Sequence, residues 1–336
     1  MFHLLERFHL LSLCSKLSVY NFYRTLEKLT SNTGISWRFL KLLKRGGRGH
    51  AVDGVTGMKP SKLAVLCPSC PRPGINLPEG WEDAPPAFKF LYAILLCMDA
   101  NFRLKNQLVS SFSRDPGLGI GWAYFIPCTS YEQYMLNNTS DADISTCVGF
   151  AALAKQDTKF CKGLRYTGVG AVTCARGEFI LTVGNLHKGE WYISQIYHWS
   201  YAAMDHIFGS AFKAHTMLLT AIISYDIACQ WFKNLFKRMT DWPEDIKLRD
   251  NVDISLVIPK FHEPAHQDED HEQFSCNLVP GMGASDCEVS ERFWGPHNPL
   301  GNSMKTMGPG SWHDVLDDHF GFWNWLKYHS MGKTPP

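Results

Sequence analysis

The chain has 336 residues, of which 45% are hydrophobic and 19% are charged, and its formal net charge is +1 at pH 7. This composition excludes an intrinsically disordered chain and is typical of a globular protein with one or two domains. The charge balance also excludes a globally basic protein, so any affinity for nucleic acid must come from local basic patches.

The first part of the chain is predicted to be a small helical and loop-rich segment. Residues 8–29 have helical periodicity, and Glu6 and Arg7 interrupt what would otherwise resemble a signal-peptide core. No apolar run approaches the ~20 residues needed to cross a bilayer, so no membrane partner is predicted. A stretch rich in proline and glycine follows and ends at Pro86. We therefore predict a first segment over residues 1–86 and a second domain over residues 87–328.

A basic patch follows the predicted helices of the first segment, in the string RFLKLLKRGGRGH. Cationic side chains of this kind contact DNA phosphates and give an affinity that depends on salt and not on sequence. The alternative, a solvated helix end followed by a Gly-Gly loop, stays open. The candidates for phosphate contacts are Arg38, Lys41, Lys44, Arg45 and Arg48.

The cysteines predict a reducing compartment. The chain has 11 of them, an odd number at irregular spacing, which is typical of free thiols in the cytosol or nucleus. Cys67 and Cys70 form a C-x-x-C pair, which is only half of a zinc knuckle because a closed structural site needs four ligands. We expect this pair to be a remnant of such a site, with zinc as an alternative cofactor that stays open.

Two long apolar runs each lead into an aspartate. FKFLYAILLCM precedes Asp99 and LLTAIISY precedes Asp226, and each run predicts a strand buried on both faces or a core helix. Strands that alternate with helices predict an α/β fold. Further strands are predicted at residues 103–111, 122–126, 169–174 and 178–183, and helices at residues 131–136, 202–219 and 229–239.

A third acidic cluster follows in the string DCEVSERFW, where Glu288 and Glu291 are three residues apart and share one face of a predicted helix. Two aspartates on adjacent strands and a carboxylate from a helix can hold two divalent cations roughly 3.5–4 Å apart, as in polymerases, nucleases and transposases. The structural alternative is a helix cap or loop residue for Asp99 and Asp226, and an acidic helix start for Glu288 and Glu291.

Two histidines lie between Asp226 and the acidic cluster. His262 and His266 occur in KFHEPAH, where a helix would bring them to one side, but Pro264 argues against a regular helix. We predict that both histidines, together with Arg292, support the carboxylates and do not bind zinc.

Long strings in the chain carry a family resemblance. YDIACQWFKNLFKRM, MDANFRLKNQLVSS, DPGLGIGWAYF, TGVGAVTCARGEF and MGPGSWHDVLDDHFGFWNWLK resemble the fungal Kyakuja–Dileera–Zisupton (KDZ) transposases. LAVLCPSCPRPGINLPEGWE resembles the end of the CxC2-type cysteine cluster that precedes them. The resemblance implies an RNase H-like mixed sheet flanked by helices, a DDE triad, and Mg²⁺ or Mn²⁺ as cofactor. Its aspartates fall on Asp99 and Asp226, and its third acidic residue on Glu288 or Glu291, with Glu288 slightly favoured by the family pattern.

The resemblance also implies DNA as partner, namely the ends and targets of a mobile element, and hence a nuclear location. Arg103 and Lys105, close to Asp99, are further candidates for phosphate contacts, and a homo-oligomer is compatible with this class. Three functions stay open: a DDE transposase that is intact, truncated or decayed, a catalytically inactive remnant that binds DNA or protein, and a nuclease that cuts host nucleic acid with the same triad.

The chain departs from the family pattern at several positions. Cys287 stands where the family has glycine, and a side chain there is unfavourable if the backbone needs a positive φ. Gly177 stands where histidine usually follows Cys174-Ala-Arg, and Asn185 replaces an aspartate. The string ISQIYHWSYAA interrupts a family string ahead of Met204.

Overall fold

The structure is a computed structural model, in which contacts divide the chain into two compact units, Met1–Lys59 and Pro60–Pro336. It describes residues 2–15, 18, 22, 25, 39–40, 42–55, 57–138, 163–186, 201–249, 251–266 and 271–331. In the first unit, helix α1 spans Phe2–Ser15. Of the predicted basic patch, Arg38 and Lys41 lie outside the described residues. Lys44 and Arg45 are exposed, and Arg48 pairs with Asp53.

A five-stranded mixed sheet forms the centre of the second unit, in the order β5-β4-β1-β6-β7. Strand β1 is antiparallel to β4 and parallel to β6, while β4 and β5 are antiparallel and β6 and β7 are parallel. The prediction of a mixed α/β fold is thus confirmed. The strands are β1 (Ile94–Asn101), β4 (Gly168–Cys174), β5 (Ile180–Leu186), β6 (Thr220–Tyr225) and β7 (Asp253–Val257).

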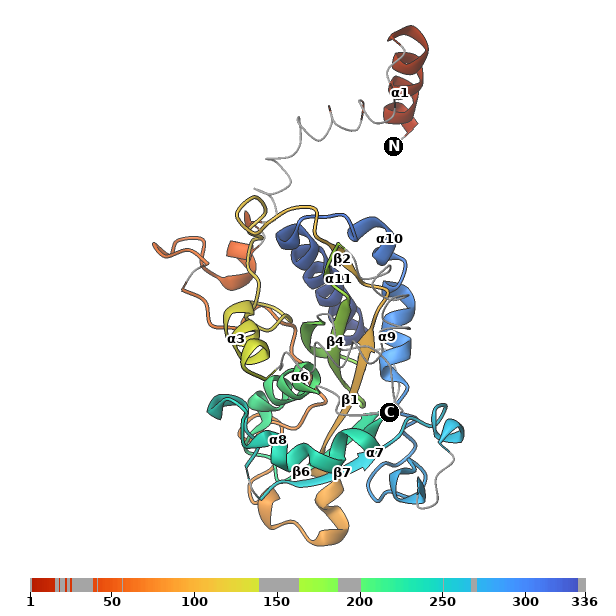
Figure 1. The fold of residues 1–336 in the computed structure, drawn as a ribbon. Coiled ribbons are helices and arrows are strands. Elements are labelled where there is room, and N and C mark those ends of the chain that lie inside the picture. Colours follow the sequence, from red (N-terminus) through yellow and green to blue (C-terminus); the bar gives the residue numbers. More distant parts are fainter. Residues whose placement is uncertain are drawn as a thin grey trace. The chain divides into compact units, whose positions relative to one another are not determined.

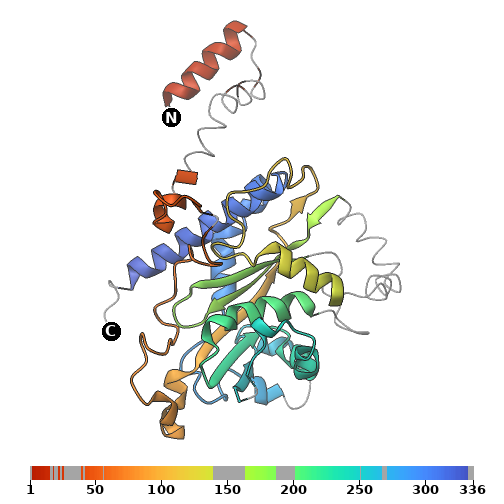
Figure 2. The same cartoon turned by 90° about the vertical axis from the view of Figure 1, so that its left-hand side faces the viewer.

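Helices cover both faces of this sheet, which explains why β1 reads as a continuous apolar run. Helix α6 (Ala202–Phe212) packs on β4 and β5, and α9 (Val289–His297) packs on β1 and β4 (Figures 1 and 2). Along β1, Leu96 and Met98 join the core that contains α6, whereas Cys97 packs on the side of α9. The other helices of this unit are α3 (Cys128–Asn138), α7 (Ala228–Trp231), α8 (Leu235–Met239), α10 (Leu300–Met304) and α11 (Pro309–Ser330).

The first predicted strand was wrong over its opening residues. Pro86–Tyr92 form a 3-10 helix, and β1 begins only at Ile94. Proline at the start of this segment fixes a helical φ, and Phe88 and Phe90 are exposed, so the apolar run does not continue the buried strand. Asp99 consequently lies inside β1 and not beyond its end.

Other strand predictions were also wrong in extent. Of residues 103–111, only Asn106–Gln107 (β2) are extended, and they pair with Leu164–Tyr166 (β3) in a separate two-stranded sheet. The reason is that the Asn106 side chain donates to the carbonyl of Met307, so this segment is held by the loop ahead of α11. Residues 122–126 form a single bridge, from Phe125 to Val183.

The helix predictions hold in part. Helix α3 confirms the one at residues 131–136, whereas residues 229–239 are broken by a 3-10 turn at Phe232–Asn234. The interrupting string ISQIYHWSYAA lies mostly outside the described residues, but its last residues, Ala202 and Ala203, begin α6 and are buried. None of the described helices is both long enough and apolar enough to cross a membrane.

A buried ion pair joins α6 to the segment after β6. Asp205 of α6 accepts hydrogen bonds from Arg238 Nε at 2.6 Å and from Trp231 Nε1 at 2.7 Å. We expect Asp205→Ala to lower the free energy of unfolding by about 3–5 kcal/mol, because it leaves Arg238 facing the interior without its counter-ion. Denaturant unfolding measures this loss.

The matched control for this prediction is Asp245→Ala, which removes an exposed ion pair with Lys213 at 2.6 Å. Exposed pairs contribute about 0–1 kcal/mol, so this variant should unfold nearly as the unmodified chain does. Equal losses in the two variants would contradict the assignment of the Asp205 pair as a buried support of the fold.

Candidate active site

The sheet brings Asp99 and Asp226 to the same edge. Because β1 and β6 are parallel, with Met98 opposite Tyr225, the next residue along each segment is an aspartate. Both aspartates line one small pocket. The other carboxylates of that pocket come from the start of α9, and His262 also lines it. The structure thus gathers five of the predicted site residues: Asp99, Asp226, His262, Glu288 and Glu291.

Asp99 is held in a fixed orientation. One of its carboxylate oxygens accepts the backbone N–H of Ala100 at 2.7 Å, and the other accepts Nε1 of Trp294 at 2.8 Å. Burial is the main cause that raises the pKa of Asp99 to about 8, and the charge of Asp226 adds to it. At neutral pH and without a cation, the Asp99 carboxyl is therefore largely protonated.

His262 lies between two of the carboxylates. Its Nε2 is 3.6 Å from Oδ2 of Asp226, and its Nδ1 is 3.7 Å from Oε2 of Glu288. Burial raises the pKa of Asp226, His262 acts against this, and the charges of Glu291 and Glu288 raise it further. His262 is thus the side chain between these carboxylates that lowers the pKa of Asp226.

The two glutamates differ in how they are held. Oε1 of Glu288 accepts the backbone N–H of Phe261 at 2.7 Å, and the N–H of Glu288 donates to Asp286 at 3.1 Å. Glu291 stands in the first turn of α9 and is exposed. Among the described residues, no hydrogen bond or ion pair holds its carboxylate. Glu288 is therefore held by hydrogen bonds to Phe261 and Asp286, whereas the carboxylate of Glu291 is available to bind a cation.

Cys287 adopts a φ of 61° directly before Glu288. This is the left-handed region, which favours glycine and costs an L-residue roughly 1–2 kcal/mol. The cysteine side chain is nevertheless buried, in a cluster that includes Cys97 and Cys276. The glycine expected from the family pattern therefore suits the observed backbone, and this chain tolerates a side chain there.

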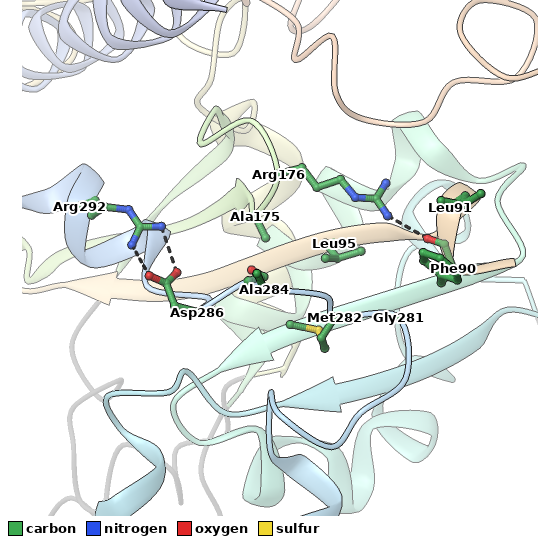
Figure 3. A pocket seen from close by; sticks show the side chains of 11 residues that line it. Phe90, Leu91, Leu95, Ala175, Arg176, Gly281, Met282, Ala284, Asp286 and Arg292 are labelled. Atoms are coloured by element: carbon green, nitrogen blue, oxygen red, sulfur yellow. Dashed lines mark hydrogen bonds and ion pairs between the residues drawn. The ribbon is translucent and has the colours of Figure 1, made fainter. Parts of the chain in front are cut away.

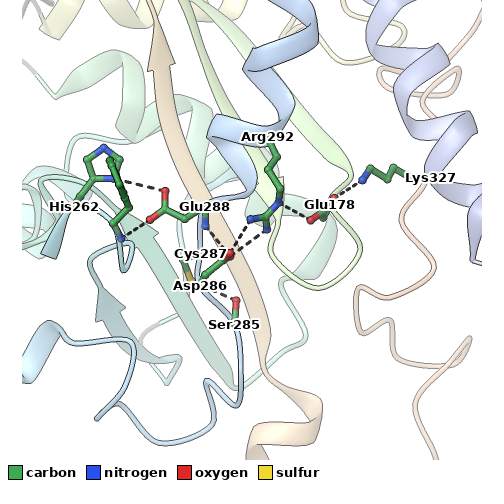
Figure 4. A network of polar contacts seen from close by, with 9 residues as sticks. Glu178, His262, Ser285, Asp286, Cys287, Glu288, Arg292 and Lys327 are labelled. Carbon is green, nitrogen blue, oxygen red and sulfur yellow. Dashed lines mark hydrogen bonds and ion pairs between the residues drawn. The ribbon is translucent and has the colours of Figure 1, made fainter. Parts of the chain in front are cut away.

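The guanidinium group of Arg292 binds carboxylates other than the two glutamates of the pocket, and only its backbone N–H donates to the carbonyl of Glu288. It forms two hydrogen bonds to Asp286, at 2.7 and 3.1 Å, and one to Glu178 at 2.8 Å. Glu178 is also paired with Lys327 of α11, so the network joins α9 to the turn after β4 and to α11 (Figure 4). Arg292 consequently anchors the start of α9 to the turn after β4.

Other predicted site residues lie apart from this pocket. His266 follows the 3-10 helix Glu263–Ala265, and its Nδ1 is 3.9 Å from the sulfur of Cys229, so it does not form a metal pair with His262. Arg103 is exposed and Lys105 is half-buried, and both lie in the loop beyond the end of β1. The C-x-x-C pair lies with Cys174, a partner that was not predicted.

A second, larger hollow of about 570 Å³ lies beside the turn after β4 (Figure 3). Arg176 and Arg292 line it, but both guanidinium groups are engaged. Arg176 donates to the carbonyl of Phe90 at 2.9 Å, and Arg292 is paired with Asp286. Since its cationic groups already have partners, this hollow has no evident anion site.

The family comparison covers the part of the chain that contains the pocket. A family model described as Kyakuja-Dileera-Zisupton transposase matches residues 92–324, and one described as a CxC2 like cysteine cluster associated with KDZ transposases matches residues 1–34. No curated protein matches the chain, and no solved structure matches it. The first match spans more than half of the sequence and includes every carboxylate of the pocket, and the chain therefore belongs to the KDZ transposase family.

Proposed function

We propose that the chain is a DDE-type DNA transposase with an RNase H-like core, in which residues 87–328 form the catalytic domain. The observation that carries this proposal is the pocket in which carboxylates from β1, β6 and α9 converge. The sheet order supports it, since an antiparallel set of three strands followed by two parallel ones is the arrangement expected of an RNase H-like core. The family match supports DNA as the partner.

The donor set of the pocket suits hard divalent cations. Carboxylate oxygens are the ligands that Mg²⁺ and Mn²⁺ prefer, and no lysine or arginine is among the described residues that line the pocket. Asp99, Asp226 and Glu291 would hold the cations. When bound, a pair of cations activates the attacking water or 3′-hydroxyl and stabilises the leaving oxygen of the phosphodiester.

The neighbouring residues have positioning roles in this proposal. Trp294 donates to Asp99 and fixes the direction of its carboxylate, and the N–H of Phe261 does the same for Glu288. His262 lies within 4 Å of both Asp226 and Glu288 and limits their repulsion. For phosphate contacts we propose Arg103 and Lys105 beyond β1, and Lys44 and Arg45 in the first unit. A protein that acts on DNA in this way would be located in the nucleus.

The two glutamates should respond differently to substitution. Glu288→Gln keeps an acceptor for Phe261 and should lower the cleavage rate by about 10–100-fold, as loss of an outer-shell partner does. Glu291→Gln should lower it further, because it removes a ligand from the cation site. Single-turnover cleavage in Mn²⁺ measures both rates, and the reverse order would give the third ligand position to Glu288.

The proposed function is tested by nicking of supercoiled DNA by the full chain in Mg²⁺, in Mn²⁺ and in a chelator. One plasmid carries the DNA that flanks the gene of this protein, and a second carries a scrambled sequence of equal length. A transposase should cut the first plasmid preferentially and only with the cation. Equal cutting of both plasmids would indicate a general nuclease, and salt-sensitive binding without cutting would indicate an inactive remnant.

A further inference from the structure

Three cysteines that are far apart in the sequence meet in the second unit. The sulfur atoms of Cys67, Cys70 and Cys174 all lie within 4.8 Å of one another, and all three side chains are buried. Cys67 and Cys70 belong to the loop region ahead of β1, whereas Cys174 is the last residue of β4. All three are free thiols, so no disulfide accounts for their proximity.

The loop that carries the C-x-x-C pair is shaped by its own hydrogen bonds. Nδ2 of Asn76 donates to the carbonyl of Pro68 at 3.0 Å and to that of Cys70 at 2.9 Å. Its Oδ1 accepts the backbone N–H of Arg72 at 2.6 Å. The sulfur atoms of Cys67 and Cys70 thus belong to a loop whose conformation is stabilised by its own internal hydrogen bonds.

The turn after β4 is also adapted to these sulfur atoms. A Cβ added at Gly177 would lie 2.8 Å from the sulfur of Cys67, so only glycine permits this approach without a shift. The backbone N–H of Gly177 donates to the sulfur of Cys174 at 3.4 Å. An N–H donor of this kind favours the thiolate, which is the form of cysteine that binds metals.

A buried histidine stands beside the same loop. Nδ1 of His215 is 3.2 Å from the carbonyl of Pro71, the residue that follows Cys70. Metal-bound histidines almost always donate one ring N–H to such a carbonyl and bind the metal through the other nitrogen. The imidazole of His215 is buried, and in this metal-free structure it is not part of the group of ligand atoms that lie within 4.8 Å of one another.

We propose that Cys67, Cys70 and Cys174 bind a zinc ion as thiolates, and that His215 moves toward them on binding to become the fourth ligand through Nε2. Three cysteines and one histidine are a ligand set of closed, tetrahedral structural zinc sites. The oxygen ligands of the acidic pocket suit a different class of cation, so the two sites select different metals. This proposal replaces the expectation that the C-x-x-C pair is only a remnant of such a site.

The ion would join three segments of the second unit: the loop at residues 67–70, the end of β4, and the 3-10 helix Lys213–His215 that follows α6. Cys174 pairs with Leu96 of β1, the strand that carries Asp99. Zinc binding would therefore link the end of β4 to the loop at residues 67–70. Because β4 is the neighbour of β1, which carries Asp99, the role of the zinc would be to stabilise the structure beside the acidic pocket.

The test is the metal content of the full chain purified without added chelator. We expect about one zinc per chain that is lost in Cys174→Ser and kept in Cys128→Ser, a control that removes a half-buried cysteine of α3. Replacement with Co²⁺ should give sulfur-to-cobalt charge-transfer absorption in the unmodified chain. His215→Ala should keep this absorption but bind Co²⁺ more weakly.

Since Cys174→Ser could fail to fold, the unmodified chain provides a second readout. A chelator should lower its melting temperature, and added zinc should restore it. The proposal is overturned if the unmodified chain neither contains nor takes up zinc, or if a folded Cys174→Ser variant keeps it. Unchanged Co²⁺ affinity in His215→Ala would overturn the assignment of the fourth ligand. Each result is independent of DNA cleavage and leaves the proposed function to be judged separately.

Discussion

Asp99→Asn should abolish cation-dependent DNA cleavage and at the same time stabilise the metal-free protein. The cleavage is lost because an amide is a poor ligand for Mg²⁺ or Mn²⁺ and cannot replace the central carboxylate. The stability rises because the substitution removes a partly buried carboxyl that lies against Asp226, whose charge raises the pKa of Asp99. The amide oxygen can keep the hydrogen bond from Trp294, while the one that Ala100 donates to the other oxygen is lost, so the gain in stability is reduced by this loss.

Asp317→Asn is the matched control. Asp317 of α11 is another carboxyl whose pKa is raised by burial, to about 7, and it accepts the N–H of Tyr124 at 3.1 Å outside the acidic pocket. Its substitution should leave cleavage unchanged. Cleavage assays in Mn²⁺ and denaturant unfolding in a chelator give the two readouts. An Asp99→Asn variant that still cuts DNA at the original rate would remove Asp99 from the catalytic site.

The stability of the metal-free protein should fall as the pH rises from about 4 to about 8. The unfolded chain titrates Asp99 near its ordinary pKa of ~3.9, whereas the folded chain titrates it at about 8. Between these values the folded state binds more protons, so the free energy of unfolding decreases with increasing pH. Each pKa unit corresponds to about 1.4 kcal/mol, which makes the loss on the order of a few kcal/mol.

The contribution of Asp99 is isolated by comparing the unmodified chain with Asp99→Asn over the same pH range. Other buried carboxyls, such as Asp205 and Asp317, also have raised pKa values, and their effects cancel in this difference. Added Mn²⁺ should restore the stability of the unmodified chain at pH 8, because a bound cation replaces the proton, and should restore much less in Asp99→Asn. Parallel pH profiles for the two proteins would contradict the account.

The carboxylates that line the pocket could be predicted from the sequence because local signals mark each of them. Long apolar runs lead to Asp99 and Asp226, and the spacing of Glu288 and Glu291 places both on one helix face. The start of β1 could not be predicted in this way, because the exposed 3-10 helix Pro86–Tyr92 is as apolar as the strand that follows it.

Contacts between residues that are distant in the sequence could not be predicted from local sequence patterns. Cys174 and the C-x-x-C pair are far apart in the sequence, and it is the tertiary fold that brings them together. Trp294 resembles a core residue in the sequence, and it is buried, but its N–H also donates to Asp99. The different surroundings of Glu288 and Glu291 depend on Phe261, which reaches the pocket from another loop.

The most direct test of the central claim is anomalous scattering from crystals of the full chain soaked in Mn²⁺. The account predicts one or two manganese peaks coordinated by Asp99, Asp226 and Glu291, with the zinc site at Cys67, Cys70 and Cys174 distinguished by its own absorption edge. Manganese that binds elsewhere, or no manganese between ordered carboxylates at a concentration that supports cleavage, would contradict a cation-dependent DDE site in this pocket.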